Sequence, residues 1–250
     1  MNGISERVSG AWRLACAALI GALLAGAGVW YWQGGGAAMP AAADKAAIEK
    51  VVREYILANP EILPKAMENL QKRETAKQLA GVQDDIEVPF PGAVLGNPQG
   101  KVTLVEFSDF ACGYCKQSEA DVAALIAANP DLKVVVRQLP ILSEASTDAA
   151  RMGLAAARQG LYSAFHHAMY AAGRPDAATI DAAAQAAGLD LARAKRDIAD
   201  PALEREIQGN LEFARQLGFN GTPSWVIGAE VHAGAVGREV LAEAIARARG

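Results

Sequence analysis

Cysteine is scarce in this 250-residue chain, and the scarcity limits what the thiols can do. There are three cysteines, and Cys16 lies inside an apolar N-terminal run. Outside that run only Cys112 and Cys115 occur. The folded part therefore has no spare pair for a structural disulfide, and its one possible internal disulfide joins Cys112 to Cys115.

Basic charge and histidine are also in short supply. The chain has 24 Lys and Arg against 28 Asp and Glu, a formal net charge of −4, and no basic stripe with interleaved aromatic residues. Nucleic acid is therefore excluded as the main partner. The three histidines, His166, His167 and His232, show no ligand spacing to the cysteines. A zinc site needs about four ligands, so we expect no zinc site and assign no metal ligands.

Apolar residues are plentiful, at 52% of the chain, and the length of 250 residues suits one domain with a sizeable core plus appendages. Arg7 and Arg13 precede an apolar run over residues 14–32, and no Lys or Arg follows until Lys45. This asymmetry places the N-terminus in the cytoplasm and the rest of the chain outside. Disulfides persist in such an oxidising compartment.

Residues 1–33 fit either a signal anchor or a cleaved signal peptide. Ala25-Gly26-Ala27 offers a small-x-small cleavage site after a short apolar core. The run continues, however, through Val29-Trp30-Tyr31-Trp32, and Trp and Tyr favour a bilayer interface. We favour the uncleaved anchor, which tethers the protein to the inner membrane by residues 14–32; cleavage would leave it soluble.

Two segments lie between the apolar run and the main domain. Residues 34–43 are a flexible Gly, Ala and Pro linker. Residues 44–81 have helical spacing with apolar faces on both sides of an Asn59-Pro60 break: Ile48, Val51, Val52 and Tyr55, then Leu63, Met67 and Leu70. So short a piece cannot form its own core, so it must dock on the main domain, a second copy or lipid. Interspersed acidic residues make lipid the weakest of the three.

Residues 82–250 form the main domain. Residues 82–100 are rich in Pro and Gly and predict an irregular lead-in. Apolar runs predict strands at 102–107 and 132–139, and the stretch between them has helical spacing, so the three form a βαβ unit. Residues 143–217 are predicted to be helical, followed by a short strand at 224–228, a hairpin partner at 230–232 and a last helix at 238–247.

The sequence Cys112-Gly113-Tyr114-Cys115 stands between the first strand and its helix. A C-x-x-C in this position is typical of a redox motif. The N–H groups and positive dipole end of a helix stabilise a thiolate at its first turn. We expect Cys112 to be partly exposed, with a lowered pKa, and to attack, and Cys115, one turn deeper, to resolve. A passive staple is the weaker alternative, because so small a loop gains little entropy.

These elements resemble the DsbA family, a thioredoxin fold with a helical domain inserted in its middle. The resemblance covers about Val88 to Gly250 and rests on Glu106-Phe107, Cys112 to Cys115, Tyr162 to Met169 and Gly221-Thr222-Pro223-Ser224. The predicted fold class is therefore α/β, preceded by the anchor or signal and an amphipathic helical extension. Residues 44–81, with Tyr55 to Pro60, resemble the N-terminal extension of the ScsC-like branch, which can drive trimer formation although not every member assembles.

The resemblance implies roles for further residues. Pro223 is expected to be cis and to face the cysteines, exposing the backbone of Thr222 to a bound peptide; an ordinary trans turn is the alternative. Glu106 is expected to be buried, with a raised pKa, and to shuttle the proton of Cys115; a solvated, idle glutamate is the alternative. Gly113 and Tyr114 complete the expected substrate-binding set.

The remaining candidates are interpreted as structural. We expect His166 and His167 to be core or capping histidines rather than catalytic ones, and His232 to be a surface residue of the hairpin. Trp225 is expected to pack beneath the site.

The predicted function is that of a periplasm-facing protein thiol–disulfide oxidoreductase without a cofactor, acting on exported cysteine-containing proteins. A membrane partner would reduce or reoxidise the cysteine pair. Gly113-Tyr114 and Thr222 resemble disulfide isomerases more than strong oxidants, and no histidine stands between the cysteines. Two alternatives stay open: Cu(I) binding by the two thiolates, which suit a soft metal, and a passive chaperone that does not need Cys112.

Overall fold

The computed structural model describes residues 42–249, which divide into two compact units: the first ends at Ala66 and the second begins at Met67. The anchor or signal predicted at 14–32 and most of the linker lie outside the described residues. Between residues 42 and 249 there is no helix with the length and apolar character needed to cross a membrane.

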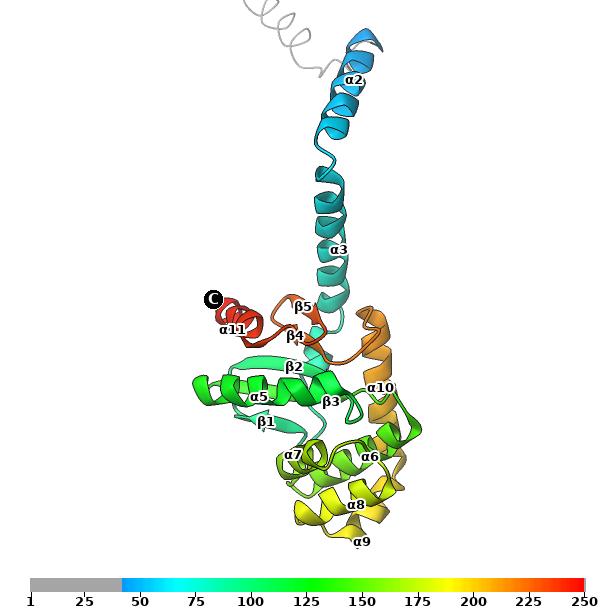
Figure 1. The fold of residues 1–250 in the computed structure, drawn as a ribbon, viewed down its shortest axis with the longest axis vertical. Helices are drawn as coiled ribbons and strands as arrows, with labels where there is room; N and C mark the ends of the chain where they lie inside the picture. Colours follow the sequence, from blue (N-terminus) through cyan, green and yellow to red (C-terminus); the bar gives the residue numbers. More distant parts are fainter. Residues whose placement is uncertain (1–41, 250) are drawn as a thin grey trace, which may run out of the picture. The chain divides into compact units, whose positions relative to one another are not determined.

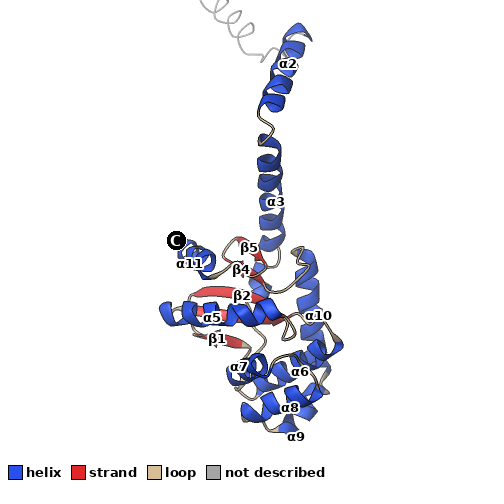
Figure 2. Cartoon of the chain, viewed as in Figure 1, coloured by secondary structure: helices blue, strands red, loops and turns tan. Residues whose placement is uncertain are grey.

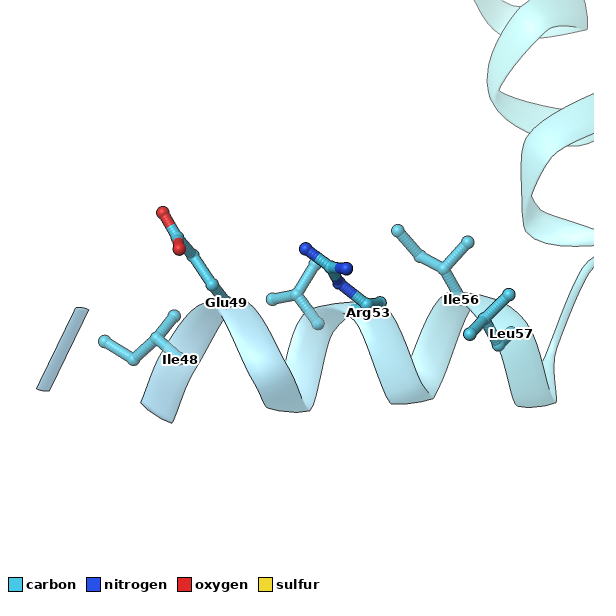
Figure 3. A pocket seen from close by; sticks show the side chains of 6 residues that line it. Ile48, Glu49, Arg53, Ile56 and Leu57 are labelled. Carbon is cyan, nitrogen blue, oxygen red and sulfur yellow. The ribbon is translucent and has the colours of Figure 1, made fainter. Parts of the chain in front are cut away.

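The predicted helical extension is present as α2 (Ala42–Ala58) and α3 (Ile62–Ala80), interrupted at Asn59-Pro60. The side-chain amide of Asn59 donates to the carbonyl of Tyr55 at 2.9 Å and so closes the end of α2. Five large apolar side chains of α2 are exposed, from 50% at Val52 to 75% at Leu57. Figure 3 shows several of them along the helix, where they line a groove of about 420 Å³.

A five-stranded sheet organises the second unit (Figure 2). Its strands are β1 (Val94–Gly96), β2 (Val102–Ser108), β3 (Leu132–Gln138), β4 (Ser224–Ile227) and β5 (Glu230–Ala233), in the order β1-β3-β2-β4-β5. Strands β2 and β3 run parallel and are joined by α5 (Gly113–Ala128), which confirms the predicted βαβ unit. The other neighbouring pairs are antiparallel, including the predicted β4–β5 hairpin.

Helices cover the sheet on both faces, which explains why β2 and β3 are apolar along most of their length. On one face Leu104 packs in a core with residues of α5 and of α11 (Arg238–Ala248), such as Val122 and Leu241. On the other face Val105 and Phe107 pack with residues that include Leu79, at the end of α3. The end of α3, at Leu79, therefore belongs to the core of the second unit.

Five helices separate β3 from β4, as the sequence predicted for 143–217. They are α6 (Glu144–Arg158), α7 (Tyr162–Ala172), α8 (Ala177–Ala186), α9 (Leu191–Ile198) and α10 (Pro201–Gln216). Helices α6 to α9 gather in one group, in which α7 lies next to β1 (Figure 1). Ser143, Asp176, Asp190 and Asp200 cap four of them by accepting backbone N–H groups. The core that these helices share has 20 buried residues. The alanines among them have small side chains that let the helices pack closely, and the 12 other residues fill the remaining volume.

The lead-in at 82–100 is more ordered than predicted. It contains α4 (Gln83–Ile86) and strand β1, whose Val94 pairs with Val135 of β3. Both elements are too short to carry a periodic pattern, and their order comes from contacts made far along the chain. Arg137 of β3, for example, donates to the carbonyls of Asp85, Ile86 and Val88.

Candidate active site

Cys112 is the N-cap of α5, as the motif predicted. Its sulfur accepts the backbone N–H of Cys115 at 3.3 Å and donates to the carbonyl of Thr222 at 3.1 Å. The residue is only 5% exposed, so the expectation of partial exposure was wrong. Thr222 lies 110 positions further along the chain, in a loop beside the sulfur. Local sequence therefore does not reveal this contact.

Cys115 lies deeper and is fully buried. Burial raises the pKa of its thiol far above the usual value, and the negative charge of Glu106 raises it further. Both cysteines are free thiols in this structure. Cys115 therefore keeps its proton until a nearby base removes it.

Glu106 occupies the middle of β2, where it pairs with Val136 on one side and Trp225 on the other. It is fully buried, as expected. Among the described residues, neither of its carboxylate oxygens has a hydrogen-bond partner. Burial raises the pKa of this carboxyl to about 7, the charge of Glu119 adds to the rise, and His166 opposes it. Near neutral pH this group can both accept and release a proton.

The loop that carries Thr222 and Pro223 leads into β4, and the Thr222–Pro223 bond is cis, as the resemblance implied. Trp225 follows in β4, is fully buried, and donates its indole N–H to the carbonyl of Gly234 at 2.9 Å. Trp225 is also the strand neighbour of Glu106. The sheet thus brings the proline loop, the buried acid and the cysteines to one place.

Gly113 and Tyr114 form the first turn of α5. Tyr114 is 66% exposed, and the space where a side chain would extend from Gly113 is open. The dipeptide therefore lies on the surface beside the buried sulfur of Cys112.

Asp109 is a residue that the sequence analysis missed. Its carboxylate accepts the N–H groups of Ala111, Ile141 and Leu142 at 2.8 to 3.0 Å, and its carbonyl accepts the hydroxyl of Tyr170. It therefore holds the cysteine loop against the loop that follows β3. An aspartate directly after a strand and before a turn is a common backbone-binding residue, and this signal was available in the sequence.

The three histidines differ in their surroundings. His166, on α7, is fully buried, and its Nε2 lies 2.7 Å from Oε1 of Glu119. His167 is largely exposed, with its Nδ1 3.2 Å from the other oxygen of Glu119. His232 lies in β5, as predicted for the hairpin, but is only 18% exposed. The sequence analysis missed Glu119, whose position one helical turn after Cys115 places it on the same side of α5.

Nowhere in residues 42–249 do three or more His, Cys, Asp or Glu side chains gather in a way that would hold a metal ion. Any metal bound at the site would therefore depend on the two thiolates.

Fold and site together define a thioredoxin-like protein with a redox-type cysteine pair. Residues 103–246 match the family described as DSBA-like thioredoxin domain, and the chain belongs to that family. Residues 44–77 match the family described as Copper resistance protein ScsC N-terminal domain. The two matches cover the main domain and the helical extension respectively.

Solved structures agree with this assignment. A thioredoxin-like oxidoreductase from Silicibacter pomeroyi is 42% identical, covers 62% of this chain and 91% of its own, and has a TM-score of 0.61. A mutant of ScsC from Proteus mirabilis is 28% identical, covers 86% of this chain and 99% of its own, and has a TM-score of 0.67. The thiol-disulfide exchange protein alpha-DsbA2 from Wolbachia pipientis is 28% identical over 71% of this chain and 97% of its own, with a TM-score of 0.65.

Curated relatives are longer proteins. The Na(+)/H(+) antiporter NhaA 1 from Salinispora arenicola is 30% identical over 182 residues, which are 69% of this chain and 28% of the antiporter. The chain thus spans little more than a quarter of the length of this relative.

Proposed function

We propose that this protein is a thiol–disulfide oxidoreductase that exchanges disulfides with exported, cysteine-containing proteins. The observation that carries the proposal is the placement of Cys112. Its sulfur caps α5 and touches the carbonyl of Thr222, next to a second thiol that is fully buried. The Cys112 sulfur can therefore react with a substrate disulfide, whereas the Cys115 sulfur can react only with Cys112.

The exchange needs two displacement steps. In the reducing direction the Cys112 thiolate attacks one sulfur of a substrate disulfide, and the other substrate sulfur leaves as a thiolate. Cys115, once deprotonated, attacks the sulfur of Cys112, which releases the substrate and forms the Cys112–Cys115 disulfide. Two electrons pass to the substrate, and the oxidising direction reverses both steps.

Glu106 is proposed to take the proton of Cys115 in the second step. It raises the pKa of the Cys115 thiol through its charge, so the two groups interact. Its own pKa of about 7 lets it accept the proton and release it near neutral pH.

Exposed apolar side chains around the cysteines favour a protein substrate. Between residues 82 and 249, the large apolar side chains with high exposure are Val88, Tyr114, Ile141, Leu142 and Val240. Tyr114 adjoins Cys112, and the loop with Ile141 and Leu142 is bound to Asp109 beside it. Apolar surface next to a reactive thiol suits unfolded chains, which expose their own apolar residues.

A periplasmic location follows from the charge asymmetry around residues 14–32 and from family membership. We propose a tether by that run, or a soluble protein if it is cleaved. A membrane partner would restore the redox state of the pair. Gly113-Tyr114 and Thr222 favour isomerase-like action over strong oxidation, since no imidazolium lies between the cysteines to stabilise the thiolate.

The helical extension is proposed to assemble copies of the chain. The exposed apolar side chains of α2 need a partner, and residues 44–77 match the ScsC N-terminal family. A trimer would bring several cysteine pairs to one misfolded substrate, which favours isomerisation.

Cu(I) binding is the second candidate function, favoured by the copper-resistance description of the family matched by residues 44–77. Two thiolates suit a soft metal. The discriminating measurement compares Cu(I) affinity of the reduced protein and of Cys115→Ser, together with insulin reduction. Loss of tight Cu(I) binding in the variant, with negligible insulin reduction by the native protein, would favour the copper function.

Substrate trapping tests the main proposal. Cys115→Ser expressed in the periplasm should accumulate mixed disulfides with exported proteins, because the resolving thiol is gone. Cys112→Ser is the matched control and should trap none. The redox potential of the pair and its redox state in cells would then settle the direction. If Cys115→Ser traps no partner and the native protein does not exchange with glutathione disulfide, the proposal is wrong.

A further inference from the structure

The exit of the Cys115 proton is the unsolved step of the proposed chemistry. Cys115 and Glu106 are both fully buried. A proton that passes from the thiol to the carboxylate is therefore still inside the protein. Every turnover must return it to solvent, so the interior needs a chain of groups that can carry it outward.

His166 is a buried titratable side chain of the kind that can carry this proton. Its ring is fully buried and packs within 5.0 to 5.7 Å of the rings of Phe110, Tyr162 and Tyr170. Its Nε2 contacts Glu119 at 2.7 Å, whereas its Nδ1 is buried and has no hydrogen-bond partner among the described residues. A buried nitrogen without a hydrogen-bond partner costs free energy. A histidine that only joins two helices would not require one.

Glu119 connects this histidine to the surface. Its side chain is 17% exposed, and its second oxygen lies 3.2 Å from Nδ1 of His167, which is 59% exposed. Glu119 and His167 both line a surface cavity of about 210 Å³, between α5 and α7. The carboxylate therefore contacts the buried imidazole on one side and solvent on the other.

We propose that His166 and Glu119 form a relay that carries the proton of Cys115 from Glu106 to the surface at His167. The inference rests on the proposed function. Glu106 takes the proton from the Cys115 sulfur and gives it to Nδ1 of His166. The imidazole releases its Nε2 proton to Glu119, which passes it to His167 or to solvent. Glu106 and His166 share no direct hydrogen bond, so a water molecule or a side-chain rotation completes that step.

The groups around His166 are compatible with this path. The titratable side chains that surround it or act on its neighbours are Glu106 on β2, Cys115 and Glu119 on α5, and Tyr162, His167 and Tyr170 on α7. Burial raises the pKa of both tyrosines well above the usual value, so they stay neutral. The charges of His166 and Glu119 act on Glu106 with opposite signs, which couples protonation along the path.

The test follows closure of the mixed disulfide in the full chain. Stopped-flow measurement of the reaction between reduced protein and glutathione disulfide, from pH 5 to 9, separates attack by Cys112 from closure by Cys115. His166→Gln and Glu119→Gln should slow closure by at least about tenfold near pH 6–7, and by up to the roughly 10²–10⁴-fold that general acid–base catalysis contributes. The deficit should shrink towards pH 9, where hydroxide removes the proton. Attack by Cys112 should be unchanged.

Asp121→Asn, on the same helix α5, is the matched control and should close at the native rate. Glu119→Gln keeps the shape of the side chain, and thermal unfolding checks that both variants are folded. Closure rates equal to the native ones at every pH overturn the relay, as does a slowing that is the same at every pH. If Glu106→Gln slows closure and the relay variants do not, only the relay fails. If the native protein does not exchange, the proposed function itself fails.

Discussion

The two thiols of the site are three residues apart and yet differ in chemistry, because their sulfurs meet different surroundings. The sulfur of Cys112 interacts with the N–H group at the start of α5 and with the carbonyl of Thr222. Cys115 is fully buried, and burial together with Glu106 raises the pKa of its thiol. A reactive thiol and a protected thiol are the expected result.

Alkylation should reveal that difference. Iodoacetamide at pH 7 should label Cys112 at least about tenfold faster than Cys115 in the reduced protein, because only the thiolate reacts. Peptide mapping by mass spectrometry over time measures both rates. In folded Cys112→Ser, the peptide that contains Cys115 should carry almost no label. Equal rates at both cysteines would contradict the assignment of roles.

Glu106 should make the stability of the reduced protein depend on pH. Its folded-state pKa of about 7 lies above the usual value of 4.5, so the folded protein binds the proton more tightly than the unfolded chain. Stability is therefore greatest below pH 4.5 as far as this group is concerned, and it declines as pH rises towards 7. A shift of this size corresponds to about 3 kcal/mol.

Glu106→Gln should remove that decline. Urea unfolding at pH 5 and pH 8 should show a smaller difference in the free energy of unfolding than in the native protein, by up to about 3 kcal/mol. The exposed Glu243→Gln serves as control and should keep the native difference. An undiminished pH dependence in Glu106→Gln would show that another group is responsible.

At the scale of elements, α2 carries a row of apolar side chains that the described residues leave uncovered (Figure 3). Apolar surface of this kind on a short helix marks an interaction site. The sequence and the helix agree on this point, since the spacing that predicted the helix also predicted its apolar face.

A charge in that row should prevent self-association. In light scattering, the chain without residues 1–33 should be oligomeric, and Val52→Lys should make it monomeric because a lysine cannot be buried without a partner. Lys50→Ala, on an exposed position of the same helix, should keep the oligomer. A monomeric parent protein would contradict an assembly role for α2.

The end of α3 has a different role from α2. Leu79 is 1% exposed and packs with Val105 and Phe107 of the sheet. Leu79→Ala should reduce the free energy of unfolding by about 2–4 kcal/mol, the usual cost of a core leucine. Leu70→Ala, at a 56% exposed position of the same helix, should change it little. Equal effects in chemical denaturation would mean that Leu79 is not part of the core.

At the scale of the whole second unit, Arg137 joins segments that are distant in sequence. Its guanidinium donates to the carbonyls of Asp85, Ile86 and Val88 in the lead-in, and to Glu206 and Asn210 on α10. It is 4% exposed, and its hydrogen bonds link the lead-in to α10 through β3.

Arg137→Met should destabilise the protein by at least about 3 kcal/mol, because it removes the ion pair with the partly buried Glu206 and the donor to several backbone carbonyls. Loss of the arginine should also loosen α4, which hydrogen exchange of residues 83–88 would detect. Arg215→Met, which removes a surface ion pair with Glu212, is the control and should have little effect. Similar stability of the two variants would show that the network adds nothing.

Much of this arrangement was predictable from the chain. The βαβ unit, the helical insert, the β4–β5 hairpin and the cysteine pair at the start of α5 follow from apolar periodicity and from short motifs, and the cis bond before Pro223 followed from the resemblance. The order of 82–100, the burial of Cys112 and the contact between Glu119 and His166 did not. Each depends on a partner that is at least 30 residues away or on how deeply a helix packs.

The sequence by itself determined which residues are apolar, where the longer helices and strands lie, and which thiols are available, because these properties depend on spacing and residue type alone. Tertiary structure alone decided the environment of each functional group. The pKa of Glu106, the contact of Cys112 with Thr222 and the path from His166 to the surface arise only when β2, α5, α7 and the β4 loop meet. Burial and electrostatic interaction depend on distances through space rather than along the chain, so they are set only when these elements pack together.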